Sequence, residues 1–140
     1  TFEAAEVLVN LINTKRIKND LCVGSFQQST IKYMRENILR DVESAFSMQE
    51  VLSLFFHRIT KKSGDFVGTC LQIPLKYFGI NLITSNLINY CKKNNIKVHV
   101  WTINDEAVMA RLVELGINGI MTDKCRSLLK VLQKQVDFNS

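Results

Sequence analysis

The sequence predicts an α/β fold in which parallel strands alternate with helices. Apolar segments of strand length alternate with segments of helical spacing in the order αβαβαβαβα, and only a few residues connect them. Strict alternation of this kind implies right-handed crossovers and a parallel sheet covered by helices. Two architectures fit this order: a small open sheet, or four consecutive units of an eight-stranded barrel. Because a complete barrel takes about 250 residues, a chain of 140 residues would supply about half of one.

The first half of the chain has three segments with helical spacing and two with strand character. Helices are predicted at residues 2–12, 28–37 and 47–57, and strands at residues 21–24 and 42–46. The second of these strands is weak and could instead be an extended connection. A basic turn at residues 14–16 ends the first helix. Ser47 and Glu50 have the spacing of a capping box, in which each side chain satisfies an amide that the helix leaves unpaired.

The second half of the chain continues the alternation. A loop at residues 60–65 leads to a strand candidate at residues 66–73, which Pro74 ends because proline interrupts a ladder of backbone hydrogen bonds. A short extended segment is predicted at residues 80–83, helices at 84–95, 104–116 and from 123 onward, and strands at 96–101 and 117–121. Residues 137–140 are expected to fray.

Polar residues mark the ends of these later helices. Thr84 or Ser85 is placed to cap the helix that follows it, and Asn104 is a suitable N-cap for the next one. Two acidic residues follow Asn104 in the first turn, where the helix dipole favours negative charge. Gly116 is predicted to end that helix in the left-handed conformation that glycine adopts readily.

The composition predicts that residues 1–140 form one soluble globular unit. The length and the start at Thr1 predict that this unit is only part of a domain. With 46% apolar residues the chain can bury one core of ordinary size. No apolar run approaches the roughly 18 residues of a membrane-spanning helix. The formal charge is +5, but the basic clusters fall at helix ends and in loops and are not interleaved with aromatic residues, so no nucleic-acid partner is predicted. Thr1 is not a start methionine and lies within a helical pattern, which predicts a piece of a longer protein.

The cysteines and histidines carry no signature of a disulfide framework or a zinc site. Cys22, Cys70, Cys91 and Cys125 lie far apart and form no C-x-x-C pair, and the two histidines are not paired in sequence. We therefore predict reduced, structural cysteines, which fits a cytoplasmic location.

Two linked motifs in the last third of the chain resemble a known family. Residues 98–104 read Val-His-Val-Trp-Thr-Ile-Asn, and residues 116–123 read Gly-Ile-Asn-Gly-Ile-Met-Thr-Asp. Together they resemble the C-terminal signature of the glycerophosphodiester phosphodiesterase family, V-x-V-W-T-V-N followed by G-V-D-G-I-I-T-D-x-P. Three earlier segments match in the same order, so the resemblance covers essentially the whole chain; they are residues 23–26, 71–74 and 90–96. Asn118 stands where the family usually has Asp, and Cys125 where it usually has Pro.

The resemblance implies the C-terminal half of a TIM barrel of the phospholipase-C-like phosphodiesterase type. Members of the family hydrolyse glycerophosphodiesters to an alcohol and glycerol 3-phosphate, with two histidines as acid and base and Mg²⁺ or Ca²⁺ held by carboxylates. The family's His-Arg-Gly, Glu-Asn-Thr and Glu-x-Asp motifs and its second histidine precede the matched region, and none of these motifs occurs in this sequence. The implied function is that of part of a metal-dependent hydrolase of lipid and glycerol metabolism, inactive without the N-terminal half of the barrel.

By the same resemblance, three residues are candidates for binding the glycerophosphodiester substrate. Trp101 and Phe26 come at the carboxyl ends of their strands, where the sites of barrels assemble, and each would form an apolar wall. Core packing is the other explanation for Trp101. Asn104 either hydrogen-bonds the substrate or serves only as a helix cap.

No residue of the chain is assigned a catalytic or metal-binding role. His57 falls near the end of a helix and is predicted to lie at the surface. His99 shares strand parity with Trp101 and is predicted to be a hydrogen-bonded core histidine. Asp123 begins a helix, and capping explains it. The alternative function is a non-catalytic α/β binding or interaction module derived from the same fold, which a genuine start codon at Thr1 would favour.

Overall fold

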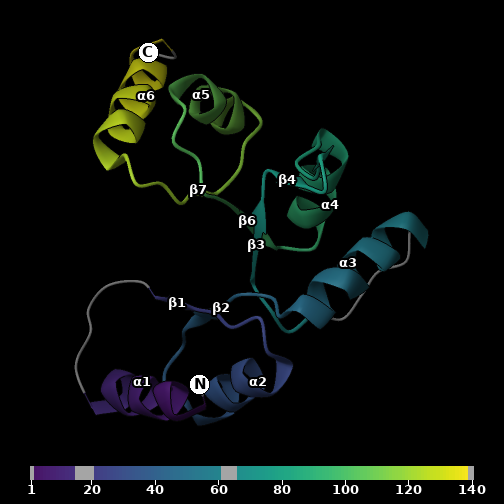
Figure 1. The fold of residues 1–140 in the computed structure, drawn as a ribbon, viewed down its shortest axis with the longest axis vertical. Helices are drawn as coiled ribbons and strands as arrows, with labels where there is room; N and C mark the ends of the chain where they lie inside the picture. Colours follow the sequence, from purple (N-terminus) through teal and green to yellow (C-terminus); the bar gives the residue numbers. More distant parts are fainter. Residues whose placement is uncertain (1, 15–20, 61–65, 139–140) are drawn as a thin grey trace. The chain divides into compact units, whose positions relative to one another are not determined.

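The structure is a computed structural model that describes residues 2–14, 21–60 and 66–138, and it divides the chain into two compact units, Thr1–Leu71 and Gln72–Ser140 (Figure 1). Apart from an inserted pair of short strands, β4 and β5, helices alternate with strands through the described residues, and the pairs β1–β2 and β6–β7 are parallel. The predicted α/β fold with parallel strands is therefore confirmed. None of the helices in the described ranges is long and apolar enough to cross a membrane.

The first unit alternates helices with short parallel strands. Its elements are α1 (Phe2–Thr14), β1 (Cys22–Val23), α2 (Gln28–Asn37), β2 (Glu43–Ser44) and α3 (Met48–Thr60). β1 and β2 pair in parallel, and Ala45 extends β2 by a parallel bridge to Cys70. Residues 42–46, predicted as a weak strand or an extended connection, therefore contain a paired strand. With β2 counted, the chain has one more strand followed by a helix, β2–α3, than the predicted order αβαβαβαβα.

A hydrophobic cluster forms between α1, α2 and β1. Its members are Ala5, Val9, Ile12, Val23, Ile31 and Met34. The three residues from α1 are four and three positions apart, so they lie along one face of the helix, while most of its other residues are exposed. The apolar residues whose spacing predicted α1 therefore include those that its buried face packs into the core.

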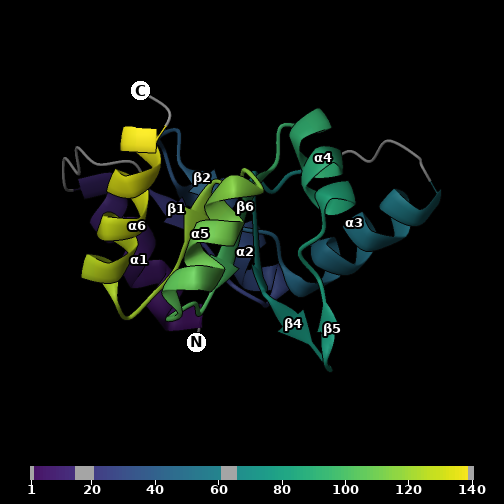
Figure 2. The same ribbon diagram turned by 90° about the horizontal axis from the view of Figure 1, so that it is seen from above.

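The second unit contains a three-stranded sheet with the order β3-β6-β7 and a separate hairpin. Its elements are β3 (Cys70–Pro74), which begins in the first unit, β4 (Lys76–Tyr77), β5 (Ile80–Asn81), α4 (Ser85–Lys93), β6 (Lys97–Trp101), α5 (Glu106–Glu114), β7 (Gly119–Ile120) and α6 (Cys125–Phe138). β6 and β7 are parallel, with His99 opposite Gly119. β4 and β5 are antiparallel and form the hairpin labelled in Figure 2.

The structure corrects several predicted boundaries. The strand predicted at residues 66–73 begins only at Cys70 and includes Pro74, which is tolerated because β3 is an outer strand of its sheet. The segment at residues 80–83 is shorter and forms one arm of the hairpin. α3 continues to Thr60, and α6 begins at Cys125 and extends to Phe138. The predicted turn at 14–16, loop at 60–65 and frayed end at 137–140 lie partly outside the described residues.

The helix ends agree with the sequence prediction at two places and differ at one. Thr84 is the N-cap of α4, and its hydroxyl accepts a hydrogen bond of 3.2 Å from the Leu87 N–H. Gly116 follows the end of α5 with a φ of 78°. The N-cap of α5 is Asp105, whose carboxylate accepts from the Val108 N–H at 2.9 Å, so the prediction that Asn104 caps this helix is wrong. Asn104 has other partners, described below.

All four cysteines lie within the described ranges, and none of them forms a disulfide there. Cys70 is buried at the start of β3, and its thiol donates a hydrogen bond to a Glu43 carboxylate oxygen at 3.2 Å. A hydrogen bond with Cys22, together with burial, raises the pKa of the Cys70 thiol. A raised pKa favours the protonated thiol, which is the less reactive form.

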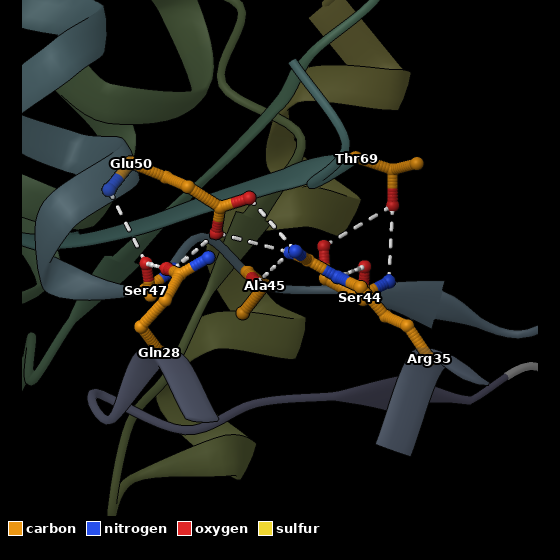
Figure 3. A network of polar contacts seen from close by, with 7 residues as sticks. All are labelled: Gln28, Arg35, Ser44, Ala45, Ser47, Glu50 and Thr69. Atoms are coloured by element: carbon orange, nitrogen blue, oxygen red, sulfur yellow. Dashed lines mark hydrogen bonds and ion pairs between the residues drawn. The ribbon is translucent and has the colours of Figure 1, made fainter. Parts of the chain in front are cut away.

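A polar network centred on Arg35 connects α2 to β2 and α3 in the first unit (Figure 3). The guanidinium donates two hydrogen bonds to the Glu50 carboxylate, at 2.7 Å to Oε1 and 3.1 Å to Oε2. It also donates to the Ser44 hydroxyl at 2.8 Å and to the Ala45 carbonyl at 2.9 Å. The Arg35 and Glu50 side chains are only 14% and 16% exposed, so this bidentate ion pair is largely removed from water.

The same carboxylate completes the predicted capping box. A Glu50 oxygen accepts from the Ser47 N–H at 2.7 Å, and the Ser47 hydroxyl accepts from the Glu50 N–H at 3.2 Å. Gln28 accepts a hydrogen bond from the Ser47 hydroxyl. On the other side of the network, the Thr69 hydroxyl accepts from the Ser44 N–H at 3.1 Å. The ion pair is therefore continuous with the start of α3 and with the residue before β3.

Glu50 gives the first unit a predictable sensitivity to acid. Burial alone would raise the pKa of Glu50, but hydrogen bonds from Arg35 and Ser47 and the Arg35 charge outweigh it and hold the pKa below its ordinary value of 4.5. A carboxylate with a lowered pKa in the folded state stabilises the fold above that ordinary value, and this stabilisation disappears as the pH falls through the folded-state pKa.

Replacing Glu50 with glutamine is expected to remove this contribution. The difference in unfolding free energy between the wild type and Glu50→Gln should be largest at neutral pH and shrink as the pH falls below 4.5, the ordinary pKa of the carboxyl, as measured by urea denaturation from neutral to acidic pH. Glu36→Gln is the matched control, because Glu36 forms an exposed pair with Lys32. If Glu36→Gln changed the pH profile as much as Glu50→Gln, the lowered pKa of Glu50 would not be the cause.

Candidate functional site

The candidate site is the carboxyl end of β6, where Trp101 is the last residue of the strand. Val98 and Val100 are buried on one face of β6, and His99 and Trp101 are half-buried on the other. This alternation matches the strand parity predicted from the sequence. Trp101 is therefore neither enclosed in the core nor fully exposed, and part of its indole remains accessible at the end of the strand.

Asn104 connects the segment after β6 to the segment after β7. Its side-chain oxygen accepts two hydrogen bonds of 3.0 Å, from the Thr122 hydroxyl and from the Asp123 N–H. Its side-chain nitrogen donates to the Asp123 carboxylate at 2.9 Å. Next to it, the Ile103 N–H donates to the Met121 carbonyl at 3.0 Å. The Asn104 amide thus holds two chain segments together at the carboxyl ends of neighbouring parallel strands.

These hydrogen bonds determine which donors and acceptors of the Asn104 amide remain available to a ligand. A backbone N–H can only donate, so the atom that accepts from Asp123 must be the oxygen. That oxygen accepts two hydrogen bonds, which uses both of its lone pairs, whereas the nitrogen carries two hydrogens and the Asp123 carboxylate takes one. One N–H of Asn104 is left, so any bond from this side chain to a substrate would be a donated one.

The two histidines lie in different units, His57 on α3 in the first and His99 on β6 in the second. The ring of His99 lies against Gly119, its partner in the β6–β7 ladder, because a Cβ added at Gly119 would come within 2.8 Å of the imidazole. His57 Nδ1 lies 2.8 Å from the Ser53 carbonyl one turn earlier in α3, and its ring contacts Phe56 and Phe66. Both residues are half-buried, so His57 is less exposed than a surface position and His99 less enclosed than a core position, and the roles expected for them stay predictions.

Phe26 belongs to the first unit and comes shortly after the carboxyl end of β1. Its side chain is 64% exposed, while its carbonyl accepts a hydrogen bond of 3.2 Å from the Met48 N–H at the start of α3. The backbone at Phe26 is therefore fixed and the ring faces outward. Whether Phe26 contacts a substrate stays a prediction, as it does for Trp101 and Asn104.

The side chains described here do not fit a divalent cation. Mg²⁺ and Ca²⁺ need several convergent oxygen ligands, usually including carboxylates. Among residues 2–14, 21–60 and 66–138 there is no group of three or more His, Cys, Asp or Glu side chains that could hold a metal ion. Asp123, the acidic residue at the candidate site, has its carboxylate bonded to Asn104. No catalytic step through a metal can therefore be assigned to these residues.

The contacts among Asn104, Thr122 and Asp123 were not predicted from the sequence. The two motifs place all three residues just after neighbouring strands, and the carboxyl ends of parallel strands meet at one edge of a sheet. This arrangement of the two motifs could have predicted the contacts, because it brings Thr102-Ile103-Asn104 close to Met121-Thr122-Asp123.

Comparison with known proteins agrees with the architecture. Residues 4–127 match the model of the glycerophosphoryl diester phosphodiesterase family. A probable glycerophosphodiester phosphodiesterase 2 of Mycobacterium tuberculosis is 25% identical over 136 residues, which cover 92% of this chain and 51% of that protein. A glycerophosphodiester phosphodiesterase of Caldanaerobacter subterraneus is 35% identical over 57 residues, covering 41% of this chain and 23% of that protein.

Solved structures show the same correspondence. A putative glycerophosphoryl diester phosphodiesterase from Silicibacter pomeroyi superposes with a TM-score of 0.70 at 14% identity, covering 96% of this chain and 45% of that one. A phosphodiesterase from Oleispira antarctica, solved with the product sn-glycerol-3-phosphate, gives 0.68 at 16% identity, covering 94% and 50%. The chain spans about half the length of the first of the relatives and of these structures, so the fold is that of part of a phosphodiesterase barrel.

Proposed function

The chain belongs to the glycerophosphoryl diester phosphodiesterase family, and from this membership we propose that it forms part of an enzyme that hydrolyses glycerophosphodiesters to an alcohol and glycerol 3-phosphate. The observation that carries the proposal is the family match over residues 4–127. The arrangement of Trp101, Asn104 and Asp123 at the ends of β6 and β7 supports it, because barrel sites assemble at the carboxyl ends of strands. Residues 1–140 are then one partial domain of that enzyme.

In the proposed enzyme, residues outside this chain transfer protons and bind the metal ion. A bound Mg²⁺ or Ca²⁺ would neutralise the charge on the phosphodiester. In this chain, Trp101 packs against the glycerol or alcohol part of the substrate, and the remaining N–H of Asn104 donates to a substrate oxygen. Phe26 forms an apolar wall in the same way, by virtue of its exposed ring. The enzyme would act in lipid and glycerol metabolism.

An activity assay that compares the complete protein with the 140-residue chain tests the proposal. The complete protein should release glycerol 3-phosphate from glycerophosphocholine in the presence of Mg²⁺ or Ca²⁺, and the 140-residue chain alone should release none. A complete protein without activity toward any glycerophosphodiester would favour the non-catalytic binding module. Turnover by the chain alone that His99→Ala abolishes would show that the catalytic residues lie in this chain.

Trp101→Ala is expected to raise the KM of the complete enzyme about tenfold, with a smaller effect on kcat, because the change removes an apolar contact made before and during the reaction. Trp101→Phe should keep most of the contact and most of the affinity. Phe56→Ala is a suitable control, since Phe56 is another accessible aromatic residue, 64% exposed on α3. An equal loss in Phe56→Ala, or an unchanged KM in Trp101→Ala, would remove Trp101 from the substrate site.

A further inference from the structure

The hairpin of β4 and β5 carries a concentrated set of exposed apolar side chains. Phe78 at its tip is 89% exposed, Ile80 is 69% exposed and Tyr77 is 56% exposed. The register places Tyr77 opposite Ile80, so these two side chains share one face of the hairpin. The rings of Tyr77 and Phe78 contact each other with centroids 4.6 Å apart. Figure 2 shows the hairpin extending away from α4.

The turn of this hairpin does not require an aromatic residue. Phe78 and Gly79 both have positive φ, 47° and 78°, as in the tight turns that favour Asn-Gly or Gly-Gly. A bulky residue with positive φ is uncommon and unfavourable, and the exposed Phe78 ring gains little packing in return. A side chain that the turn disfavours and the core does not use is best explained by a partner outside the described residues.

We propose that the tip of the β4–β5 hairpin docks on the surface of a membrane that contains anionic phospholipid. Phe and Tyr side chains settle at the boundary between lipid and water, where their apolar rings are buried and the Tyr hydroxyl stays wet. Lys76 adjoins the tip and would face the lipid phosphates. Residues 66–104 contain four lysines and no aspartate or glutamate, so no acidic side chain of this segment opposes the approach; the four are Lys76, Lys92, Lys93 and Lys97.

The hairpin is placed to bring the candidate site to such a surface. It is inserted between β3 and α4, so it begins at the carboxyl end of β3. Since α4 connects β3 to its neighbour β6, and helical crossovers join parallel strands, the carboxyl ends of β3 and β6 share one edge of the sheet. Trp101 ends β6 at that edge. Docking of the hairpin would therefore turn the edge with Trp101 toward the lipid, whatever reaction takes place there.

Vesicle co-sedimentation of the complete protein tests the proposal. The probes are vesicles of phosphatidylcholine with phosphatidylglycerol and vesicles of phosphatidylcholine alone. The wild type should partition to the anionic vesicles, less strongly at high salt, and Phe78→Asn should reduce the partition coefficient about tenfold. Asn suits the positive φ, so this variant should fold at least as well as the wild type. Ile80→Ser should weaken binding in the same direction. Leu39→Asn is the control, because Leu39 is 87% exposed in the first unit.

Docking would be overturned by no partition of the wild type, by equal partition of the wild type and Phe78→Asn, or by an equal loss in Leu39→Asn. A lower melting temperature or a changed oligomeric state in both Phe78→Asn and Ile80→Ser would also do so, because the hairpin would then be packed against another protein segment. Release of glycerol 3-phosphate from soluble glycerophosphocholine, measured in parallel, should be unchanged in Phe78→Asn. A wild type that binds vesicles but hydrolyses nothing would refute the proposed function and leave the docking surface standing.

Discussion

Replacing Arg35 with alanine is expected to lower the free energy of unfolding by about 3 kcal/mol, because it leaves a largely buried carboxylate without its cation. Arg35 donates to two Glu50 oxygens, to Ser44 and to the Ala45 carbonyl, so the change also leaves polar groups of β2 unsatisfied. Urea denaturation of the protein at neutral pH measures the loss, provided that the transition remains two-state.

The exposed pair of Lys32 and Glu36 provides a matched control for the buried pair of Arg35 and Glu50. Lys32→Ala removes the partner of Glu36, with both side chains at least 60% exposed, and should cost less than about 0.5 kcal/mol. The double variant Arg35→Ala with Glu50→Ala should be less destabilised than the sum of the two single variants, because it leaves no unpaired charge. Additive single changes, or equal effects of Arg35→Ala and Lys32→Ala, would contradict the role assigned to the network.

Asn104→Ala is expected to lower kcat/KM of the complete enzyme about a hundredfold, since a small displacement of a binding group from its productive position can cost that much. The substitution removes three hydrogen bonds that hold the residues after β6 to Thr122 and Asp123. It also removes the N–H proposed to donate to the substrate. Steady-state kinetics with glycerophosphocholine, together with thermal denaturation, would separate the kinetic loss from unfolding.

Two further variants identify which part of the Asn104 amide matters. Thr122→Val removes one of the two donors to the Asn104 oxygen and should have a much smaller effect than Asn104→Ala. Asn104→Asp keeps the acceptor but loses both N–H groups and sets a negative charge against Asp123, so it should be as harmful as alanine. If Asn104→Ala retained kcat/KM within about twofold, Asn104 would be a purely structural link.

Local signals explain how much of the fold could be predicted from the sequence. The periodicity of α1, the capping box at Ser47, the cap at Thr84 and the glycine after α5 depend on residues within one or two helical turns of each other. Interactions of this range can be recognised in a single sequence. The hairpin was missed because its turn has Phe before Gly, where the usual signal is Asn or Gly.

The parts that could not be predicted depend on residues distant in the sequence. Arg35 meets Glu50 across 15 positions, and Asn104 meets Asp123 across 19. Nothing in the local pattern distinguishes Arg35 from Lys32, the other cation of α2, because the burial of Arg35 depends on how α2 packs against β2 and α3. For the candidate site, strand parity located Trp101 correctly on β6, whereas the partners of Asn104 required the pairing of β6 with β7.

The Arg35 network also bears on the order in which the protein folds during its synthesis. The bonds from Arg35 to Ser44 and Glu50, and from Ser44 to Thr69, join residues 9 to 25 positions apart, and Ala45 pairs with Cys70, one residue before the end of the first unit. Contacts of short sequence separation form quickly, and N-terminal units fold first on the ribosome. The first unit is therefore expected to become protected from proteases once Cys70 has emerged from the ribosome and before Trp101 has emerged, and pulse proteolysis of stalled nascent chains would reveal that early intermediate.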